Sequence, residues 1–125
     1  MLRLLTDEHL SPVVAAQVRM KRPAIAIQSI HEWRNGSFRG KIDLLLLRAA
    51  NDEGLTLLTY DQSTIPPLLM EFTIAKENHG GIIFVDGDTI SSNDYGGLVR
   101  AIIAFYERCA EWEWANRISF LEREP

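Results

Sequence analysis

Apolar residues along this chain form short runs separated by polar segments, and the runs are of two kinds. The first kind is short and mostly apolar, which is typical of a strand buried on both faces of a parallel sheet. The second is longer, and its apolar residues return every three or four positions, as on one face of a helix. The expected strands cover 2–6, 24–30, 55–59, 82–85 and 117–121. The expected helices run from Ser11-Pro12 to the stop at Lys21-Arg22-Pro23 and cover 43–53, 66–75 and 94–114.

Local signals mark several of these boundaries. Ser11 can cap a helix, and Pro12 suits the first helical position. Gly54 is the expected C-terminal cap of the helix over 43–53. The segment 31–41 is polar, contains glycines and lacks periodicity, so we expect a long loop there. A loop of this length in a compact domain is often functional.

Strands that alternate with helices predict an α/β fold with a mostly parallel sheet of four to five strands. We expect one three-layer α/β/α domain over residues 1–125. In such a fold the start of each helix lies at the same sheet edge as the C-termini of the strands. Asp7 and Asp61 end strands and Asp43 begins a helix, so all three should lie at that edge. If the first and third strands are neighbours, ligands also bind at this edge.

Three carboxylates within a few ångströms of one another cannot all stay ionised without compensation. The usual compensation is a hard divalent cation with oxygen ligands, which points to Mg²⁺ or Mn²⁺. Such an ion positions a phosphodiester and lowers the pKa of a bound water. Asp7, Asp43 and Asp61 are the candidate catalytic residues and metal ligands, and Glu8 is a candidate fourth ligand.

Further residues could support this site. Thr59 and Ser63 carry hydroxyl groups that could orient the carboxylates. The long loop concentrates basic residues in an otherwise acidic chain, and these are candidates for phosphate contacts. They are Arg34, Arg39 and Lys41. A solvated loop explains the same three residues without any phosphate contact and is slightly favoured.

Each aspartate also has a simpler explanation. Asp7 could cap the first helix or close the turn after the first strand. Asp43 stands where helix capping and the helix dipole favour a carboxylate. Asp61 occupies a position that turns prefer for aspartate. Because all three aspartates are expected at one sheet edge, a common site is favoured over these separate structural roles.

Composition and charge indicate which partners and which cellular compartment to expect. The 125 residues carry a formal net charge of -4, which does not indicate the basic surface usual in nucleic-acid-binding proteins. Metal ions bound to carboxylates would reverse that sign locally. No apolar run approaches the roughly 20 residues needed to span a bilayer, and the chain shows no signal-peptide pattern. With a single cysteine, Cys109, these features predict a cytoplasmic protein without membrane association.

Three segments resemble a known family. Residues 4–12, Leu-Leu-Thr-Asp-Glu-His-Leu-Ser-Pro, are similar to the opening of PIN-like proteins of the DUF5615 group, whose first strand runs into an Asp-Glu-Asn-Leu-Ser/Pro turn. Residues 43–50 resemble that group's Asp-x-x-Ile-Leu-x-x-Ala helix. Residues 53–61 resemble its strand that begins after Glu-Gly and ends in Thr-x-Asp, and 81–83 its next strand. The resemblance covers about residues 2–85.

The resemblance implies a PIN-like fold and a metal-dependent ribonuclease, the toxin of a toxin–antitoxin pair. It places Asp7, Asp43 and Asp61 in the metal-ligand positions. RNA is then the expected substrate, and a cognate antitoxin protein and a second copy of the chain are further expected partners. Ser63 stands where the group commonly has a second aspartate, and His9 stands in place of its asparagine. The alternative is therefore a catalytically weak or inactive PIN-like module that binds RNA or a protein partner.

Other motifs lead to rival readings. Residues 84–89, Phe-Val-Asp-Gly-Asp-Thr, look like the nucleophile motif of haloacid-dehalogenase-type phosphatases, but no lysine follows them. A receiver-type phosphoacceptor would also need a lysine after a late strand. Trp112 and Trp114 cannot share one face of the helix expected over 94–114, so we expect one of them to meet a partner. His31 and His79 lack metal-ligand spacing and are expected at the surface or in loops.

Overall fold

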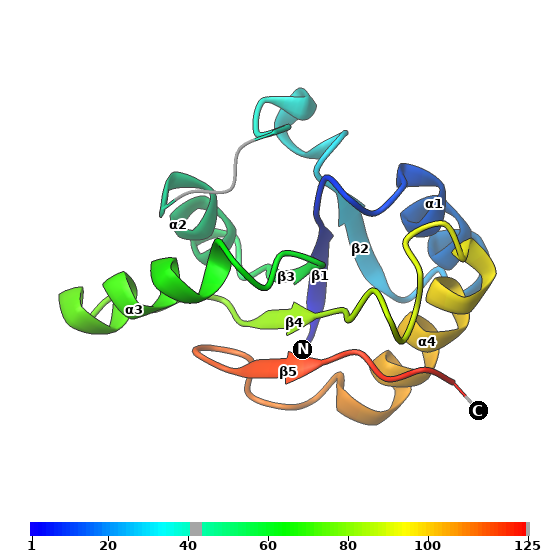
Figure 1. Cartoon of the computed structure of the whole chain (residues 1–125). Helices are drawn as coiled ribbons and strands as arrows, with labels where there is room; N and C mark the ends of the chain where they lie inside the picture. The colour runs from blue at the N-terminus through cyan, green and yellow to red at the C-terminus, as the bar shows by residue number, and fades with distance from the viewer. Residues whose placement is uncertain (41–43, 125) are drawn as a thin grey trace.

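The expected strands form one five-stranded sheet in which each neighbouring pair is parallel (Figure 1). The computed structural model describes residues 1–40 and 44–124. The strands are β1 (Arg3–Thr6), β2 (Ala26–Ser29), β3 (Thr56–Thr59), β4 (Ile82–Phe84) and β5 (Ile118–Phe120). Their order in the sheet is β2-β1-β3-β4-β5. This confirms the expected α/β class with a parallel sheet.

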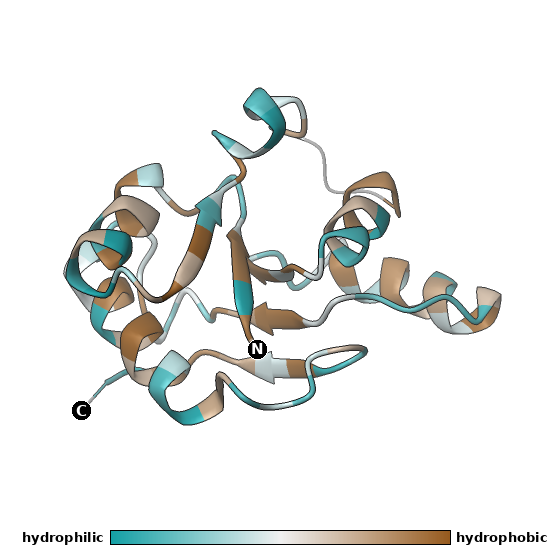
Figure 2. Ribbon diagram, turned by 180° about the vertical axis from the view of Figure 1, so that it is seen from behind, coloured by the Kyte–Doolittle hydropathy of each residue, from teal (hydrophilic) through white to brown (hydrophobic). Residues whose placement is uncertain are grey.

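Helices cover both faces of the sheet. They are α1 (Pro12–Lys21), α2 (Leu44–Asp52), α3 (Ile65–Ala75) and α4 (Tyr95–Cys109), with a 3₁₀ turn η1 (Trp33–Gly36) in the long loop. Buried residues of α1 and α4 belong to one core cluster, and those of α2 and α3 belong to another. Figures 1 and 2 show the two helix pairs on opposite sides of the strands. The chain therefore has the three layers that the sequence predicts.

The two clusters arise from the alternation of side chains along each strand. In β1, Leu4 packs with α1 and α4, whereas the next residue, Leu5, packs with α2 and α3. In β3, Leu58 and Leu57 divide in the same way. Successive side chains of a strand point to opposite faces, so a strand covered on both sides must be mostly apolar. This accounts for the mostly apolar runs in the sequence, in which buried threonines are the main polar residues.

Two of the expected boundary signals are confirmed. The hydroxyl of Ser11 accepts a hydrogen bond from the backbone N–H of Val13 at 3.2 Å, and Pro12 opens α1. Gly54 follows α2 with φ +68°, a left-handed conformation that glycine adopts without steric cost. A cap of this kind ends α2 and turns the chain directly into β3.

The C-terminal end of α4 differs from the expectation. The helix ends at Cys109 rather than near Trp114, so the helical spacing assumed for the two tryptophans is wrong. Trp114 is buried, and its indole N–H donates to the carbonyl of Cys109 at 3.0 Å. The rings of Trp112 and Trp114 stack with their centres 6.0 Å apart. The guanidinium of Arg117 lies over the Trp112 ring, 4.9 Å from its centre. The two rings therefore contact each other, and Trp112 is still 43% exposed. The expected contact of one tryptophan with a partner stays a prediction.

Strand order fixes where the candidate residues emerge. β1 lies between β2 and β3, and Thr6 is in register with Leu58. The turns that follow β1, β3 and β4 therefore leave the sheet at one edge. In this doubly wound order, the gap between β1 and β3 is the topological switch point at which ligands bind. Within the described residues, no helix is long and apolar enough to cross a membrane.

Candidate functional site

Asp7 stands one residue beyond β1, at the switch point. Its backbone N–H donates to the carbonyl of Leu58 at 3.0 Å, which extends the pairing between β1 and β3. Its carbonyl accepts from the N–H of Leu10 at 3.1 Å and closes a tight turn. The side chain is 0% exposed. Its position is therefore fixed by backbone contacts on both sides and does not depend on a flexible loop.

The carboxylate of Asp7 is held by two donors. The hydroxyl of Thr59 donates to Oδ2, and the backbone N–H of His9 donates to Oδ1 at 3.2 Å. Burial raises the pKa of Asp7, and these hydrogen bonds only partly oppose that effect; the nearby carboxylate of Asp61 raises it slightly further. A cation beside this carboxylate would stabilise its ionised form.

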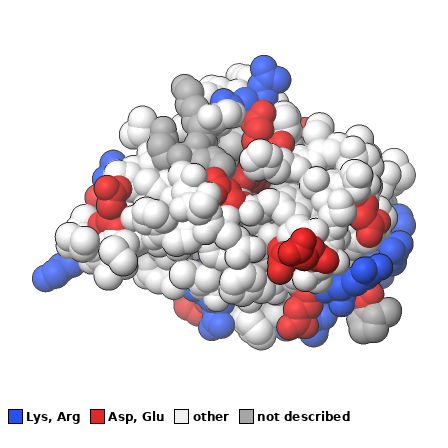
Figure 3. Space-filling model, in the orientation of Figure 1, with Lys and Arg blue, Asp and Glu red and all other residues white. Residues whose placement is uncertain are grey.

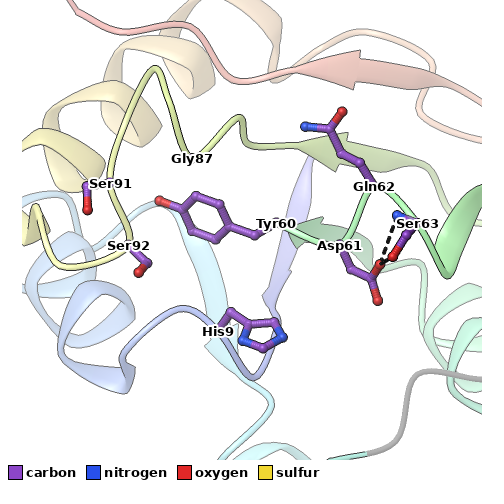
Figure 4. Close-up of a pocket in the computed structure, with 8 residues that line it drawn as sticks. All are labelled: His9, Tyr60, Asp61, Gln62, Ser63, Gly87, Ser91 and Ser92. Carbon is purple, nitrogen blue, oxygen red and sulfur yellow. Dashed lines mark hydrogen bonds between the residues drawn. The ribbon is translucent and has the colours of Figure 1, made fainter.

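Asp61 lies in the turn between β3 and α3 and is only partly buried. Its Oδ1 accepts from the backbone N–H and the hydroxyl of Ser63 at 3.0 and 3.2 Å (Figure 4). It also accepts from the backbone N–H of Thr64 at 2.8 Å. Burial tends to raise the pKa of Asp61, but the hydrogen bonds from Thr64 and Ser63 outweigh it and lower the pKa overall. Asp61 is thus ionised at neutral pH. The bonds from Ser63 and from the Thr64 backbone N–H all fall on Oδ1.

A single hydroxyl joins the two aspartates. The backbone N–H of Asp61 donates to Oγ1 of Thr59 at 2.9 Å, and the same hydroxyl donates to Asp7. Thr59 is itself fully buried at the end of β3. The structure therefore brings together Asp7, Thr59, Asp61 and Ser63, which the sequence had singled out from separate positions.

Glu8 turns away from this pair toward the long loop. Its Oε2 accepts from the backbone N–H of Gly40 at 2.9 Å. The ring nitrogen Nε2 of His31 lies 3.4 Å from the carbonyl oxygen of Glu8. These two contacts attach the loop to the turn after β1.

The basic residues of the loop are arranged differently from one another. Arg34 forms an ion pair with Glu53 at 2.7 Å, and its guanidinium lies 4.9 Å from the centre of the Trp33 ring. Its partners are thus Glu53, the residue after α2, and the loop itself. Arg39 is exposed. Lys41 and Asp43 lie outside the described residues.

A pocket of about 510 Å³ opens beside Asp61 (Figure 4). Its walls come from the turns after β1, β3 and β4. The lining residues are His9, Tyr60, Asp61, Gln62, Ser63, Gly87, Ser91 and Ser92. Only two of them, Asp61 and Ser63, were candidates from the sequence. The rule that found the aspartates, strand ends at one edge, also applies to the turn after the fourth strand and could have pointed to this wall.

Two motifs set aside in the sequence have structural roles. Asp86 accepts the backbone N–H of Asp88 at 2.9 Å, so the phosphatase-like Asp-Gly-Asp forms a turn. The expectation that His79 lies at the surface or in a loop is met by a loop position, although this side chain is buried. Its Nδ1 accepts from the N–H of Gly81 at 3.1 Å, and burial lowers its pKa.

The donors at the strand ends are of the type that hard cations prefer. Across residues 1–40 and 44–124, no three His, Cys, Asp or Glu side chains form a metal-binding group, so Asp7 and Asp61 stand as a pair. Mg²⁺ is commonly bound through one or two carboxylates and keeps several waters. The carboxylate and hydroxyl oxygens present here fit that chemistry. In Figure 3, Lys and Arg lie mainly at the margin of the face shown.

Comparison of the chain with models of known protein families, with curated proteins and with solved structures finds no match. A function is therefore inferred from the residues of the chain itself.

Proposed function

We propose that this protein is a metal-dependent ribonuclease of the PIN-like type, with Mg²⁺ or Mn²⁺ held at the carboxyl edge of the sheet. The observation that supports it is the pairing of Asp7 and Asp61 through the Thr59 hydroxyl. The family resemblance adds Asp43 as a third ligand. α2 begins at Leu44, directly after the undescribed residues.

Asp61 and Asp7 have different roles in the proposed metal site. Asp61 supplies a negative charge at neutral pH, because its hydrogen bonds lower its pKa. Asp7 supplies a second carboxylate whose direction is set by Thr59 and by the backbone of His9. When bound, the metal ion lowers the pKa of a water molecule and stabilises negative charge on the phosphodiester. The partial burial of the pair favours such electrostatic effects, since it limits screening by solvent.

The biological setting proposed from the resemblance is a toxin–antitoxin pair. The chain would then act on RNA in the cytoplasm and would be bound by a cognate antitoxin protein. A homodimer is part of the same expectation.

The proposal is tested by metal binding and RNA cleavage together. Calorimetry with Mn²⁺ should give saturable binding to the wild type and none to Asp7→Asn or Asp61→Asn. Cleavage of single-stranded RNA should require Mg²⁺ or Mn²⁺ and fall by more than about 100-fold in either variant, since losing even an outer contact of a metal site costs about 10–100-fold. Asp52→Asn is the matched control. Asp52 ends α2 and is exposed, so both readouts should match the wild type.

Cleavage that persists in a chelator and in Asp61→Asn would contradict the proposal. Retained Mn²⁺ binding in both aspartate variants would contradict it as well, because the ion would then lie elsewhere.

A second candidate, a PIN-like module with weak or no catalysis, is favoured by the side chains around the pair. Ser63 gives a hydroxyl to Asp61 instead of a further carboxylate, and Glu8 is bound to Gly40. A Ser63→Asp variant distinguishes the two candidates. If the native site is weak for want of a carboxylate, Mn²⁺ affinity and cleavage should rise. If the native site is already competent, an added charge beside Asp61 should give no gain.

A further inference from the structure

The pocket beside Asp61 has the position and size of a ligand site. It opens at the switch point between β1 and β3, where doubly wound sheets bind ligands. Its volume of about 510 Å³ lies within the roughly 300–1,000 Å³ typical of small-molecule sites. Only one wall, formed by Asp61 and Ser63, belongs to the acidic site. The remaining walls are free for a neighbouring part of the substrate.

The chemistry of these walls is polar but almost uncharged. None of the eight lining residues is Lys or Arg, and Asp61 is the sole carboxylate among them. Phosphate groups are usually held by basic side chains, so this lining does not favour phosphate. Hydroxyl groups of Ser91 and Ser92 and the aromatic rings of Tyr60 and His9 instead suit a neutral, planar ligand with hydrogen-bonding edges.

Tyr60 is held in place as a fixed aromatic surface. Its hydroxyl donates to the carbonyl of Ile90 at 2.8 Å, and its ring packs against the core cluster formed with α1 and α4. Part of the ring still lines the pocket. Figure 4 shows the ring between the Ser91–Ser92 segment and the turn that carries Asp61. A ring ordered before binding loses little conformational entropy when a ligand stacks on it.

The wall beyond the hydroxyl of Tyr60 is anchored too (Figure 4). Ile90 is buried in the same core cluster, and Ser91 and Ser92 follow it directly. The hydroxyl of Ser91 donates to Asn93 at 2.7 Å, which leaves its oxygen able to accept a hydrogen bond. Ser92 is exposed at the pocket. The two serines can thus offer both donors and acceptors at a defined distance from the Tyr60 ring.

We infer that this pocket binds one unpaired nucleobase of single-stranded RNA, stacked on Tyr60 with its edge toward Ser91 and Ser92. The role in RNA recognition rests on the proposed function, whereas binding of the base itself does not need the metal. Only an unstacked base exposes both a face and an edge, as in single-stranded RNA. A base held here would place the adjoining backbone next to Asp61.

The inference is tested by titrating the ¹⁵N-labelled protein with the four ribonucleosides in a chelator, following backbone amide resonances. At least one nucleoside should shift the amides of His9, Tyr60, Ser91 and Ser92 in a saturable way. Inorganic phosphate and ribose, the probes that lack a base, should not shift these amide resonances. In Tyr60→Leu the affinity should fall about tenfold, the scale of losing one base–aromatic stack. Tyr60→Phe, which keeps the ring, should keep most of the affinity.

Two further variants guard the interpretation. Tyr95→Leu removes an exposed tyrosine that does not line the pocket and should bind nucleosides like the wild type. Ser92→Trp, at an exposed loop position, should block the pocket without changing the core and abolish binding. If Tyr60→Leu does not fold, Ser92→Trp decides the question.

The inference is overturned if no nucleoside shifts these amide resonances, or if phosphate or ribose produces the same shifts. It is also overturned if Tyr60→Leu, or Ser92→Trp where Tyr60→Leu does not fold, binds nucleosides like the wild type. Because the titration contains no free metal, its result is separate from the test of cleavage. Nucleoside binding without metal-dependent cleavage would contradict the proposed ribonuclease function and support the nucleobase pocket. Metal-dependent cleavage without nucleoside binding would support the ribonuclease and contradict the nucleobase pocket.

Discussion

The ends of β1 and β3 carry the same kind of residue in opposite environments. Asp7 is fully buried, and burial raises its pKa. Asp61 is partly exposed, and although burial tends to raise its pKa, hydrogen bonds from the following turn lower it. Both aspartates follow a threonine in their strands, and both depend on the hydroxyl of Thr59. Surroundings, rather than residue type, therefore decide which aspartate carries its charge readily.

The difference comes from how far each aspartate stands from its strand. Asp7 follows β1 immediately, so its backbone still pairs with β3 and its side chain stays between the layers. Tyr60 separates Asp61 from β3 and takes the place next to the core. Asp61 thus reaches a turn whose free N–H groups it can bind. One extra residue is enough to change a buried acid into a turn-capping acid.

The largest expected effect on stability is that of Thr59→Val, which keeps the shape of the side chain and removes the shared hydroxyl. It leaves the Asp7 carboxylate without its side-chain donor and the N–H of Asp61 without its acceptor. Leaving buried polar groups unpaired costs about 1–3 kcal/mol each. Urea denaturation should show a loss of about 2–3 kcal/mol in the free energy of unfolding.

Thr6→Val is the matched control for this variant. Thr6 is equally buried at the end of β1, but its hydroxyl makes one long hydrogen bond, 3.4 Å to the carbonyl of Gln28. Its replacement should cost about 1 kcal/mol or less. Equal losses in the two variants would show that Thr59 has no special part in joining the aspartates.

A second prediction concerns Asp7→Asn and the pH dependence of stability in a chelator. Because the folded pKa of Asp7 is raised above its ordinary value of 3.8, its contribution to stability is complete below about pH 3.8 and is lost as the pH rises through the folded pKa. The wild type should therefore lose stability relative to Asp7→Asn as the pH rises toward neutrality. Denaturation at a series of pH values measures the difference. If the free energy of unfolding of the wild type rose relative to that of Asp7→Asn with increasing pH, the pKa of Asp7 would be lowered in the folded protein and not raised.

The smallest expected effects concern the turn at Asp61. Asp61→Ala removes the acceptor of the Ser63 and Thr64 N–H groups, and losses of such capping bonds are about 1 kcal/mol. The folded pKa of Asp61 is lowered, so its contribution is present above about pH 3.8 and is lost as the pH falls through the folded pKa. The gap between wild type and Asp61→Ala should therefore narrow in acid, opposite to the trend for Asp7.

Ser63→Ala sharpens this last comparison. It removes only the hydroxyl contact at 3.2 Å and keeps the backbone contacts, so it should cost about 0.5 kcal/mol. A cost as large as that of Asp61→Ala would mean that the side chain of Ser63, rather than the backbone of the turn, holds Asp61 in place.

Local patterns predicted much of this fold. Short, mostly apolar runs located all five strands. The central strands β1, β3 and β4 are mostly apolar because both of their faces are covered, whereas the edge strand β5 exposes Ile118 and Phe120. The shared edge of Asp7 and Asp61 followed from the direction of parallel strands.

The end of α4 was misplaced because Trp112 and Trp114 continue an apolar pattern although the helix has already ended at Cys109. Their contacts with each other and with Arg117 are tertiary and leave no periodic signal.

Several details of the site were beyond the reach of local patterns. The sequence predicted that the hydroxyl of Thr59 could orient the carboxylates, and this hydroxyl donates to Asp7. The complete burial of Asp7 was not predicted, because it depends on packing between segments far apart in the chain. The engagement of Arg34 with Glu53 is of the same kind. The pocket was missed because its serines and glycine are ordinary turn residues whose meaning depends on the neighbouring turns.

A single threonine sets the separation of the two aspartates. Since its oxygen both donates to one carboxylate and accepts from the backbone of the other aspartate, the spacing follows from bond lengths within the sheet. Loops around the edge can then lengthen, shorten or change sequence in the course of evolution without disturbing that spacing. Relatives of this chain could diverge widely in what they recognise while conserving the same pair of acids.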